Sequence, residues 1–312
     1  MEYRVLGRTG LRVSLVGLGT GGASQLGQQT GQSSSQSERV VRTALDLGIN
    51  LFDTSPAYSD SESLLGAGLA GVPRDQYILA TKYPTHHDSV LAGPDDFTAR
   101  LENSLRALRT DCIDVLQYHG VRPEQYQEVI NRIHPHALKA QEQGKVRYLG
   151  ITESVTWDGT HRMLEQALTD YLFDSVMIKY GILNQTAELE ALPMCQNRDV
   201  GVMVMAAVRT SLRTPSEAVR QISAFIDEGL LDIPRPTVND PLGLGRCDGV
   251  IPSQTRAAYQ YVAANPTVST VLVGTGNPEH LKTNVADILA PPLSEAQIAY
   301  LQSTYGTLAW TK

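Results

Sequence analysis

The chain has 312 residues, a hydrophobic content of 42% and a formal net charge of −7, a composition typical of a globular protein with a large buried core. The negative charge argues against a nucleic-acid-binding surface, which needs a clustered positive field, although Arg209, Arg213 and Arg220 are compatible with a small anionic ligand. The first residues lack the apolar core of a signal peptide, and no apolar run reaches the ~20 residues of a membrane span. We therefore expect a cytoplasmic protein with neither nucleic acid nor a membrane as partner.

The three cysteines, Cys112, Cys195 and Cys247, stand far apart in the sequence. They form no CxxC pair and no Cys/His spacing, which is typical of a protein from a reducing compartment. We predict neither a disulfide framework nor a structural zinc site.

The chain begins with a predicted β-hairpin, whose turn lies between Gly7 and Gly10. Amphipathic stretches of helical period follow, for example at 38–47, 97–108 and 124–143. They alternate with eight apolar, β-rich runs that we predict as strands, at 15–18, 49–53, 77–81, 113–118, 146–151, 175–178, 200–205 and 268–273. Eight alternating units indicate a parallel sheet closed into a (β/α)8 TIM barrel, with residues 1–312 as a single domain.

An open dinucleotide-binding sheet of the Rossmann type is the alternative fold, because the first strand runs into the glycine-rich segment 17–22, GLGTGG. This segment is not a clean GxGxxG motif that opens directly into a helix. It runs instead into residues 24–37, rich in Gln, Ser and Gly, for which we predict a mobile loop. Residues 232–253 hold four prolines and several glycines and are predicted to be a second long loop without a helix. Both loops could be lids or substrate walls on one face, or surface insertions without a role.

Four titratable side chains end neighbouring predicted strands. Asp53 and Tyr58 follow the second strand, Lys82 follows the third and His119 follows the fourth. In a parallel barrel the carboxyl ends of the strands converge on one face, where active sites lie. Each of these residues taken alone has a structural interpretation, such as a helix cap or a packing residue, but together they predict one site.

These four residues make a consistent acid–base set. A free phenol has a pKa of about 10, so Tyr58 needs help to act as an acid at neutral pH. The ammonium of Lys82 would favour the tyrosinate and so make Tyr58 a better proton relay, and Asp53 would hold that ammonium in place. His119 could then orient and polarise a substrate oxygen. A general acid without a nucleophile or metal ligands suits carbonyl reduction, with the hydride supplied by a bound cofactor.

Several segments of the chain resemble the aldo-keto reductase family. They are 48–59 (GINLFDTSPAYS), Thr81-Lys82, 114–119 (DVLQYH), the opening 6–14 (LGRTGLRVS) and the closing 274–284 (GTGNPEHLKTN). The similarity covers nearly the whole chain in the family's order. It implies an (α/β)8 barrel, NADPH as the usual hydride donor, Tyr58 as the acid and Asp53, Lys82 and His119 as its support.

The resemblance also implies where the nicotinamide binds, and there this chain departs from the family pattern. Thr152 and Glu153 stand where the family has the Ser-Asn pair that grips the nicotinamide amide, and an ionised Glu153 can only accept hydrogen bonds. Met177 replaces the usual Gln, and Met205 replaces the aromatic residue that stacks on the ring, a contact that a thioether can still make. We interpret this part of the site as remodelled, not lost.

The phosphate end of the cofactor is predicted at the segment Gly274-Thr275-Gly276, which lets backbone N–H groups approach an anion. Asn277, Pro278 and Glu279 then form the N-cap, N1 and N2 positions of a helix. Family habit and Arg209 favour NADPH, whereas the lack of a strong base around His280 leaves NADH possible. The predicted cofactor contacts are Thr20, Gly21, Asp53, Thr152, Glu153, Met177, Met205, Ala206, Val208, Arg209, Gly274, Thr275, Gly276, His280 and Asn284.

Other histidines and the last tryptophan have simpler interpretations. His86-His87-Asp88 resembles a metal site but lies in a proline-containing loop, so we predict a substrate-loop wall or solvated surface. His134 and His136 are predicted to be structural, on the outer ring. Trp310 is either part of a free tail or a cap on the substrate pocket.

The sequence therefore predicts a reversible NAD(P)H-dependent reductase of an aldehyde, ketone or sugar-like carbonyl, a monomer or weak homo-oligomer. One alternative is a redox-neutral enzyme that retains its cofactor during an elimination or epimerisation. Another is a nucleotide-binding regulatory subunit, as some members of the family are.

Overall fold

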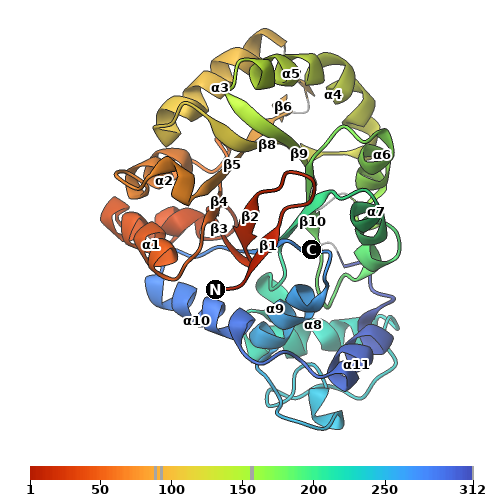
Figure 1. The fold of residues 1–312 in the computed structure, drawn as a ribbon. Coiled ribbons are helices and arrows are strands. Elements are labelled where there is room, and N and C mark those ends of the chain that lie inside the picture. Colours follow the sequence, from red (N-terminus) through yellow and green to blue (C-terminus); the bar gives the residue numbers. More distant parts are fainter. Residues whose placement is uncertain (88–89, 92–93, 155–157, 311–312) are drawn as a thin grey trace.

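A β-hairpin covers one end of the barrel in the computed structural model, which describes residues 1–87, 90–91, 94–154 and 158–310. Strands β1 (Tyr3–Val5) and β2 (Arg12–Ser14) pair antiparallel, and the glycines of the turn, Gly7 and Gly10, both have positive φ. Figure 1 shows the hairpin crossing in front of the barrel. The predicted hairpin is confirmed.

The eight predicted strands form one closed parallel barrel. In the cyclic order β10-β11-β12-β3-β4-β5-β8-β9, each strand pairs with its two neighbours. The (β/α)8 TIM barrel is therefore confirmed, and the Rossmann alternative is excluded. The strands are β3 (Val16–Gly19), β4 (Leu51–Asp53), β5 (Ile78–Pro84), β8 (Ile113–Val121), β9 (Val146–Glu153), β10 (Ser175–Lys179), β11 (Gly201–Met205) and β12 (Thr270–Val273), with a further short pair, β6 (His86–His87) and β7 (Val90–Leu91), outside the barrel.

The barrel interior is a packed core. Side chains from alternate strand positions, among them Leu51, Val115 and Met203, meet inside the barrel, and Leu6 and Val13 of the hairpin close its lower end. Polar side chains lie at the opposite end of the barrel, where the strands terminate.

Helices surround the barrel (Figure 1) and bury the outer faces of its strands. They are α1 (Ser34–Asp46), α2 (Ser61–Gly68), α3 (Pro94–Leu108), α4 (Tyr126–Arg132), α5 (His134–Glu142), α6 (Arg162–Asp170), α7 (Ala191–Asn197), α8 (Pro215–Asp227), α9 (Gln254–Ala264), α10 (Pro278–Leu289) and α11 (Glu295–Tyr305). In the described part of the chain, none of these helices is long and apolar enough to cross a membrane.

The stretch 124–143 is helical, as its period indicates, but it divides into two helices because Pro135 cannot donate to the preceding turn and its ring crowds that turn's carbonyl. One prediction about local structure was wrong. The segment 24–37 is not a plain loop. It contains the 3-10 helix η1 (Gln25–Thr30), and α1 begins within it, where the side chain of Ser33 accepts from the N–H of Gln36. Serine is frequent in loops and is also a preferred helix N-cap, so composition alone could not show where the loop ends and α1 begins.

The segment 232–253 has only one short helical turn, η6 (Leu244–Arg246), as predicted from its breakers. It packs on α11, where the hydroxyl of Tyr305 donates to Leu242 O at 3.0 Å and Nε2 of Gln297 donates to Val250 O at 3.1 Å. That it shares a face with 24–37 stays a prediction.

Candidate active site

A buried ion pair joins the ends of strands β4 and β5. Nζ of Lys82 donates to both carboxylate oxygens of Asp53, at 2.7 and 2.6 Å, and to the carbonyl of Thr54 at 2.8 Å. Both charged side chains are almost completely buried, at 2% and 3% exposure. Although burial opposes the charge, the carboxylate of Asp53 and then Tyr58 raise the pKa of Lys82 above its usual value. The lysine therefore carries a fixed positive charge next to the loop that holds Tyr58.

Tyr58 reaches this charge from the loop between β4 and α2. Its ring centroid lies 5.0 Å from Nζ of Lys82. Burial raises the pKa of Tyr58 more than the ammonium of Lys82 lowers it, so the phenol stays protonated. As expected, Lys82 lowers the pKa of Tyr58, but burial outweighs this effect. Tyr58 is therefore a protonated phenol and not a tyrosinate. That is the form which can give a proton to a substrate.

His119 faces the same phenol from the end of β8. Its Nε2 lies 3.4 Å from the hydroxyl oxygen of Tyr58, and the two rings are perpendicular. Burial, and then Lys82, lowers the pKa of His119 to about 3, so the imidazole is neutral at physiological pH. Its Nδ1 lies 3.2 Å from the hydroxyl of Ser55, which already accepts from the N–H of Ala57. A Ser55 hydroxyl that donates to Nδ1 favours the tautomer with its proton on Nε2, beside Tyr58.

Gln117 is a site residue that the sequence reasoning missed. It is completely buried, pairs in register with Lys82, and donates from Nε2 to Oδ1 of Asp53 at 2.9 Å. The available signal was a polar residue two positions before His119 within the same predicted strand. Alternation places both side chains on the inner face of the barrel.

Thr152 and Glu153, which are predicted to contact the nicotinamide, make buried polar contacts with neighbouring segments of the protein. Oγ1 of Thr152 accepts from the N–H of Gly120 at 2.7 Å. The carboxylate of Glu153 accepts from the backbone N–H of Lys179 at 2.5 Å and contacts Nδ1 of His161 at 2.8 Å. Both oxygens of Glu153 are thus engaged within the protein, so its contact with a cofactor stays a prediction.

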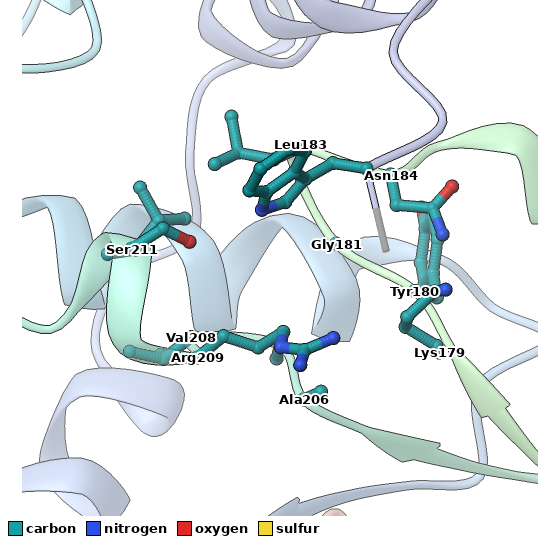
Figure 2. A pocket seen from close by; sticks show the side chains of 12 residues that line it. Lys179, Tyr180, Gly181, Leu183, Asn184, Ala206, Val208, Arg209 and Ser211 are labelled. Atoms are coloured by element: carbon teal, nitrogen blue, oxygen red, sulfur yellow. The ribbon is translucent and has the colours of Figure 1, made fainter. Parts of the chain in front are cut away.

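Five further predicted positions lie on or after two neighbouring strands, β10 and β11. Met177 points into the barrel core from β10, and Met205 ends β11. Ala206, Val208 and Arg209 follow β11 and line a recess with Lys179, a residue that the sequence reasoning did not select (Figure 2). Trp310 also lines this recess and packs against Phe225 with ring centroids 5.0 Å apart, so its side chain is docked and not part of a free tail.

Close backbone contacts shape the site around β3. The hydroxyl of Thr20 donates to that of Thr54 at 2.8 Å. A Cβ on Gly21 would lie only 2.6 Å from ring atoms of Tyr58, so the absence of a side chain makes room for the phenol. Gln28 of η1 donates to Oγ of Ser61 at 2.9 Å and to the carbonyl of Tyr58 at 3.3 Å.

The predicted phosphate end has the expected helix start. The side chain of Asn277 accepts from the N–H of Glu279 at 2.9 Å, and Pro278 occupies the first turn of α10. The segment Gly274-Thr275-Gly276 leads into this helix, with Gly276 packed against Gly27 of η1. His280 and Asn284 follow along α10.

Metal ligands are not gathered anywhere in the described ranges: no group of three or more His, Cys, Asp or Glu side chains could hold an ion there. Nδ1 of His86 lies 2.9 Å from the hydroxyl of Thr85. The side chain of His87 and all of Asp88 fall outside the described residues. His134 lies on α5, where its Nδ1 is 3.0 Å from the hydroxyl of Tyr118, in agreement with a structural role.

Comparisons with known proteins agree with this architecture. The model described as "Aldo/keto reductase family" matches residues 16–305. The chain is 30% identical to L-galactose dehydrogenase of Arabidopsis thaliana, with 92% of this chain and 88% of that protein covered. It is 26% identical to D-threo-aldose 1-dehydrogenase of Pseudomonas sp, with 88% and 89% covered. An aldo-keto reductase of Bacillus halodurans, solved in a holo form, superposes with a TM-score of 0.75 at 25% identity, with 97% and 96% covered.

Proposed function

Because the chain belongs to the aldo/keto reductase family, we propose that it reduces the carbonyl of an aldehyde, ketone or sugar-like substrate with hydride from NADPH or NADH, and oxidises the alcohol in reverse. The observation that carries this proposal is the contact of Tyr58 with neutral His119 beside the ammonium of Lys82. Two relatives named for L-galactose and D-threo-aldose support a sugar-like substrate.

The residues at the predicted phosphate end fit such a cofactor. The N-terminus of α10 presents backbone N–H groups beside Gly274 and Gly276, and an anion at that place is favoured by the helix dipole. Arg209 adds a cation after β11. With the phosphates held there, the nicotinamide would lie towards Met177 and Met205. When bound, the reduced nicotinamide supplies the hydride.

The protein's own residues move and stabilise the proton. Tyr58 donates its phenolic proton to the substrate oxygen as negative charge develops there. Lys82 stabilises the phenolate that remains, and Asp53 keeps this lysine charged and fixed. His119, neutral at the working pH, donates from Nε2 to the same substrate oxygen. In the reverse direction the phenolate accepts the proton of the alcohol.

The test is the rate of reduced-nucleotide oxidation with a panel of aldehydes, ketones and aldoses, for wild type and Tyr58→Phe. We expect turnover with NADPH, NADH or both, and a loss of roughly 10²–10⁴-fold in Tyr58→Phe. Cofactor that survives gel filtration while no net oxidation occurs during substrate conversion would favour the redox-neutral alternative. Tight nucleotide binding with no conversion of any substrate would favour a regulatory subunit.

A further inference from the structure

The loop that carries Tyr58 needs support from outside itself. Residues 56–57 and 59–60 of this loop are exposed, and Ser59 has a φ of 53°, a left-handed conformation that is unfavourable for a residue with a side chain. Turn hydrogen bonds run from the N–H of Tyr58 to Ser55 O and from the N–H of Ser61 to Tyr58 O, each 3.1 Å long. A proton donor has to stay within hydrogen-bond reach of the reacting oxygen, so the contacts that fix this loop bear on catalysis.

The side chain of Gln28, which belongs to η1, contacts this loop at three places. Its Nε2 donates to Oγ of Ser61 at 2.9 Å and to Tyr58 O at 3.3 Å, and its Oε1 accepts from the N–H of Asp60 at 3.0 Å. The hydroxyl of Ser61 in turn donates to Thr20 O at 3.2 Å, so its oxygen is left to accept from Gln28. Both ends of the carboxamide are therefore engaged by the segment that leads from Tyr58 into α2.

These contacts need the residue type that stands at position 28. A glutamine amide has two N–H hydrogens and a carbonyl oxygen, and here the donor end meets oxygens while the acceptor end meets a backbone N–H. A glutamate of the same size would keep the acceptor but lose both donors. The Nε2 of Gln28 also donates to Gln25 O at 2.8 Å, which restrains the side chain within η1. Gln29, the next residue, is exposed and donates from Nε2 to Oε1 of Gln25 at 3.1 Å.

The turn η1 can hold the loop because it is itself fixed to the barrel. Leu26 is completely buried, and its carbonyl accepts from the hydroxyl of buried Ser37 in α1 at 2.8 Å. Gly27 has a φ of 97° and lies so close to Gly276 that a Cβ on Gly276 would stand 2.3 Å from the Cα of Gly27. Gln28 therefore projects from a turn whose position is set by α1 and by the segment after β12.

We propose that Gln28 is a positioning residue for Tyr58, which fixes the backbone of the loop so that the phenol meets the substrate oxygen opposite His119. This proposal rests on the proposed reductase function, in which Tyr58 is the acid. The contacts of Gln28 are with the loop backbone and with Ser61, so its effect on the reaction passes through the place that the loop gives to the phenol. Composition gave no sign of this role, because Gln28 is one of several glutamines in the segment 24–37.

The experiment is a double-variant cycle, measured as reduced-nucleotide oxidation with an aldehyde or aldose that wild type reduces. We expect Gln28→Ala to lower kcat by about ten- to a hundredfold with little change in KM, on the order of the cost of misplacing a catalytic group by 1 Å. Gln28→Glu keeps the size of the side chain but cannot donate, so it should not restore the rate. Gln29→Ala, in the same turn, is the matched control and should leave kcat unchanged.

The Tyr58→Phe background separates a positioning role from a structural one. Because the effect of Gln28 passes through the phenol, Gln28→Ala should cause no further loss of kcat in Tyr58→Phe. The proposal would be overturned if Gln28→Ala lowered kcat by the same factor in both backgrounds, since the two residues would then act independently.

Amide hydrogen exchange of the free protein tests the contact without turnover. In Gln28→Ala the N–H of Asp60 loses its acceptor, so we expect exchange in peptides that cover 58–61 to become several-fold faster. Peptides from the barrel strands should exchange as in wild type, and Gln29→Ala should change neither. Unchanged exchange at 58–61 in Gln28→Ala would overturn the proposal, whatever the rates of reduction. Reduction that does not depend on Tyr58 would instead contradict the proposed function.

Discussion

Oδ1 of Asp53 accepts from Nε2 of Gln117 at 2.9 Å and from Nζ of Lys82 at 2.7 Å, so one carboxylate oxygen binds both a neutral and a charged donor. Gln117 therefore extends the ion pair of Asp53 and Lys82, and these three inward-facing side chains come from three consecutive barrel strands. Because Gln117 is hydrogen-bonded to Asp53, we expect any effect of Gln117 on catalysis to pass through Asp53.

Replacing Gln117 by Leu should lower kcat by up to about tenfold, since a hydrogen bond to a charged group is lost. Burial raises the pKa of Asp53, whereas Lys82 and Gln117 lower it. Without Gln117 the pKa of Asp53 rises, so the acidic limb of the kcat profile should move to higher pH. A pH–rate profile checks this, with Gln117→Asn as the partly conservative variant. A lower kcat with an unmoved acidic limb would mean that Gln117 only packs.

Much of this arrangement could be predicted from sequence because it depends on local pattern. Apolar runs of strand length gave all eight barrel strands, and a titratable residue at the end of such a run had to lie at the carboxyl face of the barrel. Asp53, Lys82 and His119 were found in this way.

Contacts between distant segments could not be predicted in the same way. The packing of Gly27 on Gly276, and that of Trp310 on Phe225, depend on the conformation that the loops adopt around the closed barrel. No periodicity in the sequence encodes these contacts. The net pKa shift of Tyr58 could not be predicted from the sequence either, because it is set by how deeply the phenol is buried.

Removal of Lys82 should strongly destabilise the fold. In Lys82→Met the carboxylate of Asp53 stays buried without its cation, a change that costs about 3–5 kcal/mol in the free energy of unfolding. The double variant Asp53→Asn/Lys82→Met should recover part of that loss. Denaturant unfolding measures both. As a control, Arg132→Ala breaks the exposed Arg132–Glu128 pair and should cost no more than about 1 kcal/mol. A similar cost for both single variants would contradict a buried, coupled pair.

Stability should fall on acidification because His119 is held neutral. Its pKa in the folded protein is about 3, below the value of 6.5 for an unperturbed histidine. Between these values the unfolded chain binds a proton that the folded chain does not, so the free energy of unfolding decreases as pH falls through this window. One such group contributes roughly 1.4 kcal/mol per pH unit. In His119→Gln the slope of unfolding free energy against pH, measured between those two values, should be smaller by about that amount. An unchanged slope would mean that His119 is already protonated in the folded protein.

Gly21→Ala should impair catalysis more than stability. The added Cβ would lie 2.6 Å from ring atoms of Tyr58, closer than side chains tolerate, and the half-buried phenol can shift to relieve the contact. A displaced hydroxyl no longer meets the substrate oxygen opposite His119, so kcat should fall by ten- to a hundredfold, on the order of the cost of misplacing a catalytic group by 1 Å. Gly19→Ala is the matched control, because its Cβ meets no atom closer than 3.6 Å. Steady-state rates and thermal unfolding of both variants, measured together, separate a displaced phenol from general damage. If the two alanines lowered kcat equally, the approach of Gly21 to the Tyr58 ring would not be what orients the acid.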